Sequence, residues 1–180
     1  MVATLIALMA LALFHFVYES IVAPDLRLWL TSKLYGLRKE ASLLKLECAG
    51  TAAELHCILL QESINVLISE LRRISLASLV GIEIESRKNP GFLARATQRL
   101  RMLDECTSPR IQEIRAQCLD IATKALAVNS IGWAALLVAP WAIASVGISA
   151  SKTRLRVLVL LNSGEFQRIS PFKSANEALI

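Results

Sequence analysis

The sequence predicts an all-α integral membrane protein with two transmembrane helices and an intervening antiparallel helical bundle. Three observations lead to this fold class. Of the 180 residues, 54% are hydrophobic and 19% are charged, whereas soluble domains are about a quarter charged. Two long stretches carry no charge, and the segment between them repeats apolar residues at alternating steps of three and four. The composition excludes a disordered chain and a small disulfide-rich secreted domain.

The first uncharged stretch runs from Met1 to Tyr18 and, after Glu19, continues toward Pro24. A helix rises about 1.5 Å per residue, so about 20 residues cross a hydrocarbon core of about 30 Å. Residues 1–23 are therefore expected to hold the first transmembrane helix, which can continue into the next helix after an interruption at Pro24. The competing interpretation is a cleaved signal peptide, which the absence of Lys or Arg before the apolar residues disfavours.

The second uncharged stretch lies between Lys124 and Lys152, and a transmembrane helix is expected at residues 128–150. The competing interpretation is a buried core helix, although a soluble domain of this size rarely buries so many uncharged residues on every face. Small residues recur four apart in this stretch, a spacing that lets helices approach closely in lipid. The expected helix-association face, which predicts a homo-oligomer, consists of Ala135, Ala139, Ser145 and Ser149.

Residues 25–127 are expected to form a bundle of roughly four helices, and two long helices crossing with a small one are a near alternative. Four apolar seams with heptad spacing support this, and they cover residues 30–48, 57–74, 93–103 and 111–128. Turn signals at 48–50 and 89–91, and a serine and proline at 108–109, separate the seams. The last seam reaches the second uncharged stretch without a helix breaker, which predicts one helix from the bundle into the membrane.

The basic residues predict the sidedness of the protein. Most of the 20 Lys and Arg lie between the two uncharged stretches, so the positive-inside rule places the bundle in the cytoplasm. The tail, residues 151–180, carries basic residues of its own and disagrees with this topology, unless it folds back to the cytoplasmic face. Within the tail, the apolar residues 155–161 fit either a short strand or a membrane-hugging helix.

Polar residues inside the uncharged stretches are the first candidates for function. His15 and Glu19 are four apart and share one face of the first helix. Ionisable groups at membrane depth are costly and often functional. Together with Asn129 they form the expected membrane polar site, as a proton or cation relay or as a contact between subunits. In the competing interpretation the helix sits shallower, so that Tyr18 and Glu19 reach the headgroups and His15 extends toward them.

A second candidate site follows the first stretch, where bulky apolar and basic side chains are mixed. Such a mixture is typical of contact with an anionic leaflet, and equally of a bundle helix that passes the headgroup zone. The expected lipid-surface residues are Arg27, Trp29, Lys33, Arg38 and Lys39.

Signals for catalysis and for cofactors are missing. The sequence has no nucleophile elbow, phosphate loop, zinc-protease or dinucleotide motif, so we expect no enzyme, cofactor or metal. The four cysteines lack a CxxC pair, and Cys48, Cys57 and Cys118 fall on apolar seams, where reduced thiols pack. A site of His56 with cysteines is the rival interpretation. No aromatic residues interleave with the arginines near residue 99, so no nucleic-acid partner is expected.

The sequence therefore predicts a non-enzymatic membrane protein whose helical bundle acts as an assembly or interaction module. Its expected partners are the lipid bilayer, further copies of the same chain and an unidentified protein that binds the bundle. The alternative is a small ion-conducting or membrane-perturbing effector, in which His15, Glu19 and Asn129 line the path.

Overall fold

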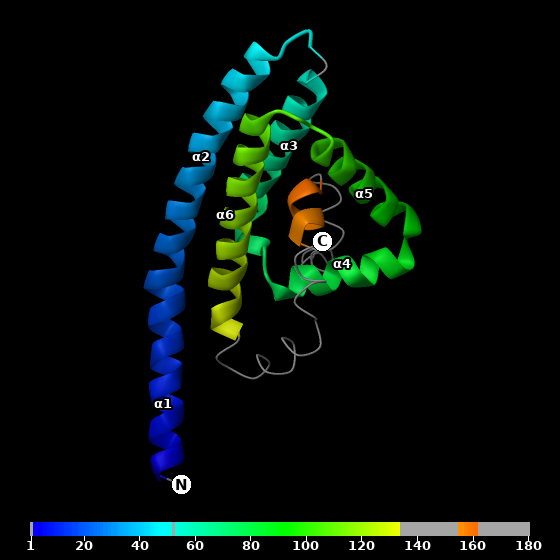
Figure 1. Ribbon diagram of the computed structural model, residues 1–180. Helices are drawn as coiled ribbons and strands as arrows, with labels where there is room; N and C mark the ends of the chain where they lie inside the picture. The colour runs from blue at the N-terminus through cyan, green and yellow to red at the C-terminus, as the bar shows by residue number, and fades with distance from the viewer. Residues whose placement is uncertain (1, 52, 134–154, 162–180) are drawn as a thin grey trace, which may run out of the picture.

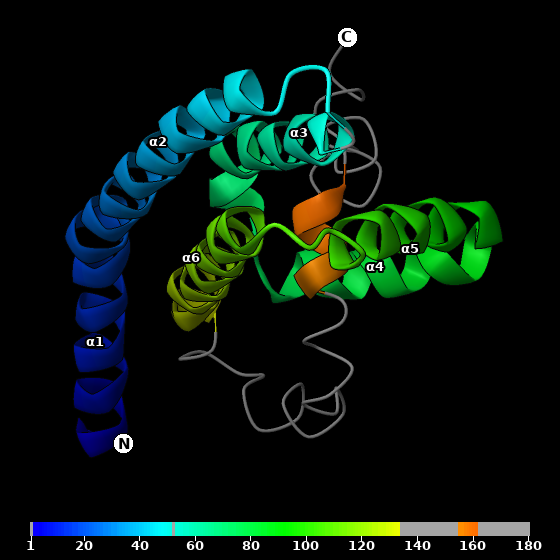
Figure 2. The ribbon, with the colours of Figure 1, turned by 45° about the horizontal axis from the view of Figure 1, so that its top comes forward.

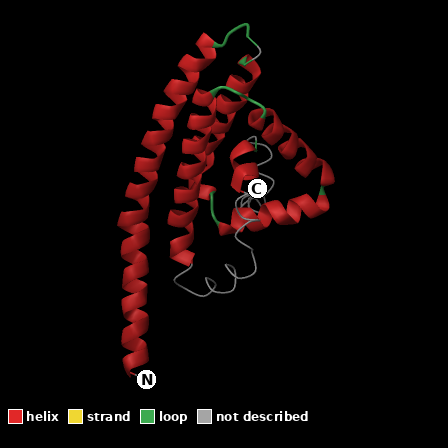
Figure 3. Ribbon diagram, in the orientation of Figure 1, coloured by secondary structure: helices red, strands yellow, loops and turns green. Residues whose placement is uncertain are grey.

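The computed structural model describes residues 2–51, 53–133 and 155–161, and its regular structure there is entirely helical (Figure 3). The all-α prediction is thus confirmed for these residues. The elements are α1 Val2–Val17, the π-helical turn η1 Tyr18–Val22, α2 Ala23–Glu47, α3 Glu54–Glu70, the 3-10 turn η2 Leu71–Arg73, α4 Leu76–Lys88, α5 Pro90–Asp104 and α6 Pro109–Trp133. Residues 155–160 add a short helical segment.

Helices α1 and α2 form one continuous rod whose N-terminal part extends beyond the rest of the structure (Figure 1). Pro24 has no N–H group, so a regular α-helix would leave the carbonyl of Ser20 without its donor and press the proline ring against it. The chain instead widens into η1, where the Ala23 N–H donates to the carbonyl of Tyr18, five residues back. The rod therefore passes Pro24 without a break.

Helices α3 and α6 run back along α2, and the three helices pack on one another (Figures 1 and 2). Their shared core contains side chains from the predicted seams, including the fully buried Leu34, Ile64 and Ile111. Gly50 turns the chain between α2 and α3 with a φ of 74°, in the left-handed region that favours glycine at a helix end. Pro109 begins α6, at the predicted position.

The structure differs from the expected bundle after the second seam. The helix that carries the second seam, residues 57–74, ends at Glu70, and the chain passes through η2 and extended backbone at Ile74 and Ser75 before α4 begins. Helices α4 and α5 then form a hairpin that projects from the three packed helices (Figures 1 and 2). Three packed helices with a projecting pair thus replace the single bundle of roughly four.

The apolar residues 155–161 belong to the core of the protein. They form neither a strand nor an exposed surface helix: residues 155–160 are helical, and their apolar side chains are no more than 6% exposed. They share a core cluster with Leu67 of α3 and Phe92 of α5. Arg99 of α5 donates from Nη1 to the carbonyl of Leu160 at 3.2 Å. This part of the tail therefore lies with the bundle.

The predicted second transmembrane helix, residues 128–150, lies mostly outside the described residues. The association face of Ala135, Ala139, Ser145 and Ser149 lies outside them entirely. Residues 128–133 form the end of α6. Since α6 and residues 155–161 contribute to one core, a single crossing between them would separate packed segments by a bilayer. The packing of 155–161 does not support that second crossing.

Candidate functional site

Helix α1 is apolar and exposed along its length. Leu5, Met9 and Leu13 are 62%, 66% and 65% exposed, and Phe14 and Phe16 are similarly exposed. Within the described residues, the rod Val2–Glu47 is the one helix long and apolar enough to cross a membrane, and its apolar part is almost wholly unburied. Each Å² of apolar surface left in water costs about 25 cal/mol. Helix α1 therefore carries a long apolar surface that the rest of the described structure does not cover.

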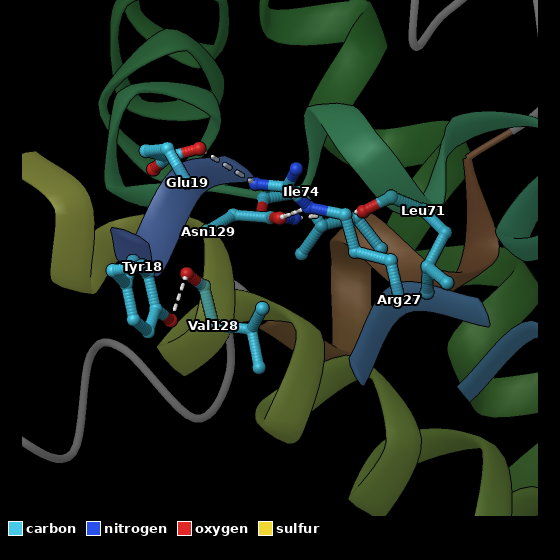
Figure 4. A network of polar contacts seen from close by, with 7 residues as sticks. All are labelled: Tyr18, Glu19, Arg27, Leu71, Ile74, Val128 and Asn129. Carbon is cyan, nitrogen blue, oxygen red and sulfur yellow. Dashed lines mark hydrogen bonds and ion pairs between the residues drawn. The ribbon is translucent and has the colours of Figure 1, made fainter. Parts of the chain in front are cut away.

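Polar side chains connect α1, α2 and α6 where the apolar helix ends (Figure 4). The Tyr18 hydroxyl donates to the carbonyl oxygen of Val128 at 2.8 Å. Arg27 donates from Nε to Oδ1 of Asn129 at 2.7 Å, and its Nη2 lies 3.6 Å from Oε2 of Glu19. We call these five residues, with the main-chain carbonyls of Leu71 and Ile74 described next, the polar joint.

The side chain of Asn129, which belongs to α6, caps the C-terminal end of α3 and η2. Its Nδ2 donates to the carbonyl oxygens of Leu71 and Ile74, each at 2.8 Å. Carbonyls at a helix end have no donor within their own helix, so a side chain must supply one when they are buried. Asn129 itself is 6% exposed. Both of its amide hydrogens and its oxygen therefore have partners inside the protein.

Ser130, the next residue of α6, holds the start of α4. Its Oγ accepts a hydrogen bond of 3.3 Å from the main-chain N–H of Leu76. The preceding residue Ser75 makes no side-chain cap to α4. The pair Asn129 and Ser130 therefore binds both ends of the break between α3 and α4. The arrangement is mechanical: it fixes the apolar rod, α6 and the projecting hairpin relative to one another.

Two of the three residues of the predicted membrane polar site belong to the polar joint. Glu19 and Asn129 meet through Arg27, whereas His15 lies one helical turn before Glu19 and takes no part. The Nδ1 atom of His15 is buried and has no hydrogen-bond partner among the described residues. The sequence placed Tyr18 at the headgroups only in the competing interpretation, and its contact with Val128 of α6 could not be predicted from the sequence.

The predicted lipid-surface residues all lie on α2 but differ in environment. Arg27 has a side-chain exposure of 21% and is engaged by Glu19 and Asn129. The other four, Trp29, Lys33, Arg38 and Lys39, are exposed. The Lys33 ammonium lies 4.0 Å from the centre of the Trp29 ring, in a cation–π contact. Whether these four residues meet lipid stays a prediction.

The four cysteines are free thiols, and three of them, Cys57, Cys106 and Cys118, are buried. Burial raises the pKa of Cys118 to about 12. Burial, and then contact with Cys48, raises the pKa of Cys57 to about 12. His56 has a buried Nδ1 without a partner among the described residues. No group of three His, Cys, Asp or Glu that could hold a metal occurs in the part of the chain that the structure describes.

Comparisons with protein-family models, with curated proteins and with solved structures find no match to this chain.

Proposed function

We propose that the chain is a non-enzymatic membrane protein that α1 anchors in the bilayer and whose helices α2–α6 act as a cytoplasmic assembly module. The observation that carries this proposal is the contrast within one rod: α2 packs against α3 and α6, whereas α1 exposes apolar side chains along its length. A bilayer supplies the apolar surroundings that α1 lacks in water. Val2–Val17 rises about 24 Å, which together with the Tyr18 ring covers most of a hydrocarbon core of about 30 Å.

The polar joint suits the edge of that hydrocarbon core. Tyrosine rings favour the membrane interface, where the ring is in apolar surroundings and the hydroxyl is hydrogen-bonded. Glu19 is neutralised by Arg27, and Asn129 accepts a further hydrogen bond from the same guanidinium. The carboxylate of Glu19 is then not left unpaired at the boundary, where its desolvation would be costly. The joint would hold the membrane helix at a fixed angle to the cytoplasmic module.

The charges support a cytoplasmic module. All 20 Lys and Arg follow α1, the first of them being Arg27. Because residues 155–161 pack into the core, one crossing by α1 puts the basic tail on the same side as the bundle, in agreement with the positive-inside rule.

Insertion of α1 can be tested with a matched pair of charged substitutions. A lysine at the centre of a membrane helix costs about 3 kcal/mol of insertion free energy. Met9→Lys, at a position 66% exposed in the middle of α1, should therefore release much of the protein from vesicles at alkaline pH, as measured by carbonate extraction. Leu46→Lys, at a position 75% exposed near the other end of the rod, is the control and should stay with the vesicles. Equal extraction of the two variants would exclude the proposal.

Self-association in the bilayer is the second part of the proposal, and His15 supports it. The His15 ring is partly exposed on α1, so its other ring nitrogen, Nε2, can hydrogen-bond to a second copy of α1, a bond worth about 1 kcal/mol in lipid. His15→Leu should therefore raise the dissociation constant of the oligomer about fivefold, as measured by energy transfer between labelled copies in vesicles. Phe16→Leu, at a position 66% exposed, is the control. No energy transfer with the unchanged chain would exclude self-association.

Ion conduction is the function to separate from this proposal. Glu19 and Asn129 are engaged in the polar joint, where they connect helices. Vesicles that contain the unchanged protein should therefore show the same ion flux as empty vesicles. Vesicles that contain the Glu19→Gln variant should show this flux as well. A flux that depends on Glu19 would favour the ion-conducting alternative.

A further inference from the structure

Helix α4 has two apolar faces, and only one of them is buried. Leu79 and Ile82 are in the main core together with residues of α5. Leu76, Val80 and Ile84 are spaced four apart on the opposite face and are 37%, 49% and 48% exposed. Single exposed apolar residues are common, but a continuous apolar stripe on a helix indicates a binding surface.

Two hydrogen bonds place the start of α4 at the level where α1 ends. Tyr18, the first residue after α1, binds the carbonyl of Val128 in α6. Two residues further along α6, Ser130 binds the N–H of Leu76, the first residue of α4. Less than one turn of α6 separates these two contacts. If α1 spans the hydrocarbon core, α4 thus begins at its boundary.

The exposed stripe of Leu76, Val80 and Ile84 faces a direction that follows from two features of α4: how the helix runs, and on which side its buried face lies. Helix α4 runs crosswise to α1 (Figures 1 and 2), so it would lie along a membrane that α1 crosses. Helix α5 lies on the side of α4 away from the N-terminus of α1 (Figure 1). Because Leu79 and Ile82 pack in the core with α5, the opposite stripe is turned toward the N-terminal end of α1. That end is on the membrane side.

Basic residues flank the stripe at both ends of α4. Arg72 and Arg73 precede α4, and Arg87 and Lys88 end it; all four are exposed. Arg73 pairs with Glu70 and Arg87 with Glu83. Within the described part of the chain, Arg72 and Lys88 have no carboxylate partner. An apolar stripe with cations at its ends matches the boundary between acyl chains and anionic headgroups.

We infer that α4 is an interfacial helix that rests on the cytoplasmic leaflet and inserts Leu76, Val80 and Ile84 among the lipids. The inference rests on the proposed membrane insertion of α1, which fixes where the bilayer lies. The projecting hairpin α4–α5 would then act as a second attachment point that keeps the module from rotating about the rod. The occupant of the stripe is lipid with anionic headgroups.

Spin labels at Val80→Cys and Ile84→Cys test the inference in vesicles that contain anionic lipid. Cys48 is first replaced by alanine, and the other three native cysteines are buried. Collision with oxygen, which concentrates in the bilayer, is compared with collision with a water-soluble nickel complex. Both labels on α4 should favour oxygen. A label at Gln98→Cys, exposed on α5 of the same hairpin, should favour nickel.

Two further labels separate the failure of this inference from the failure of the proposed function. Leu13→Cys should lie deep in the bilayer, and Leu46→Cys should lie in water. A nickel-accessible Leu13 label would contradict the membrane insertion of α1 itself. An oxygen-accessible Leu13 label together with nickel-accessible labels on α4 would overturn the inference alone. Low access of both reagents to the α4 labels would show that protein covers the stripe, and would also overturn it.

Discussion

The hydroxyl of Tyr18 donates a hydrogen bond of 2.8 Å to the main-chain carbonyl oxygen of Val128, 110 residues further along the chain. It joins the end of the apolar helix α1 to the last turns of α6. Tyr18, Ala23 and Val128 also form a small buried cluster of their own. The π-helical turn makes this contact possible, because its extra residue per turn changes the direction in which the side chains before Pro24 point relative to α2.

Tyr18→Phe should lower the free energy of unfolding by about 1 kcal/mol. The substitution keeps the ring in its cluster and removes only the hydroxyl, and a hydrogen bond of this kind contributes about 0.5–1.5 kcal/mol. Thermal unfolding in detergent micelles, followed by circular dichroism, measures the change. Tyr35→Phe is the control: Tyr35 is 53% exposed on α2, so its loss should leave the transition in place. Equal transitions for both variants would show that the Tyr18 hydroxyl does not stabilise the fold.

Asn129→Ala should be more destabilising than Tyr18→Phe. It leaves the carbonyls of Leu71 and Ile74 without a donor from α6, and a buried polar group that loses its partner costs about 1–3 kcal/mol. We expect a loss of about 2–4 kcal/mol in the same unfolding measurement. Asn65→Ala, on the exposed side of α3, serves as the control and should change little. A smaller loss at Asn129 than at Tyr18 would contradict the assigned role of the amide.

The helices themselves could largely be predicted from the sequence. Apolar spacing predicted that residues 30–48 and 111–128 are helical with buried seams, and Leu34 and Ile111 are fully buried in α2 and α6. Gly50 and Pro109 mark helix ends because their chemistry is local: glycine adopts positive φ without strain, and proline suits the first helical position. Such short-range preferences can be predicted from a single sequence.

The break between α3 and α4 could not be predicted in this way. Residues 71–75 contain neither glycine nor proline, and the break is closed by Asn129 and Ser130, more than 50 residues away. The same holds for the candidate site. Glu19 and Asn129 were predicted to be polar residues of one site, but the arginine that joins them could not be identified until α2 and α6 were seen side by side. The burial of residues 155–161 likewise depends on long-range packing.

Ser130→Ala should loosen the first turn of α4 without unfolding the protein. The substitution removes the acceptor for the N–H of Leu76, at 3.3 Å, in a helix whose own Ser75 does not cap it. Loss of a helix cap typically costs about 1 kcal/mol. Hydrogen exchange at the first turn of α4 should therefore become about fivefold faster, with α3 unchanged. Ser130→Thr keeps the hydroxyl and should exchange like the unchanged chain. Uniform acceleration in all helices would instead indicate global destabilisation.

The buried thiol of Cys118 should make the protein less stable as pH rises above about 9. Its pKa is raised by burial from 9.0 to about 12 in the folded chain. Below pH 9 the thiol is protonated in both states, so its contribution to stability is fully present. Between pH 9 and 12 the Cys118 thiol ionises only in the unfolded chain, which lowers the free energy of unfolding by up to about 1.4 kcal/mol per pH unit.

Unfolding midpoints measured across this pH range should therefore fall less steeply for Cys118→Ala than for the unchanged chain. Ile114→Val, which shortens a buried side chain of the same helix without removing an ionisable group, should lower the midpoints and keep the steeper fall. Parallel curves for the unchanged chain and Cys118→Ala would mean that the thiol ionises as readily in the folded state as in the unfolded one.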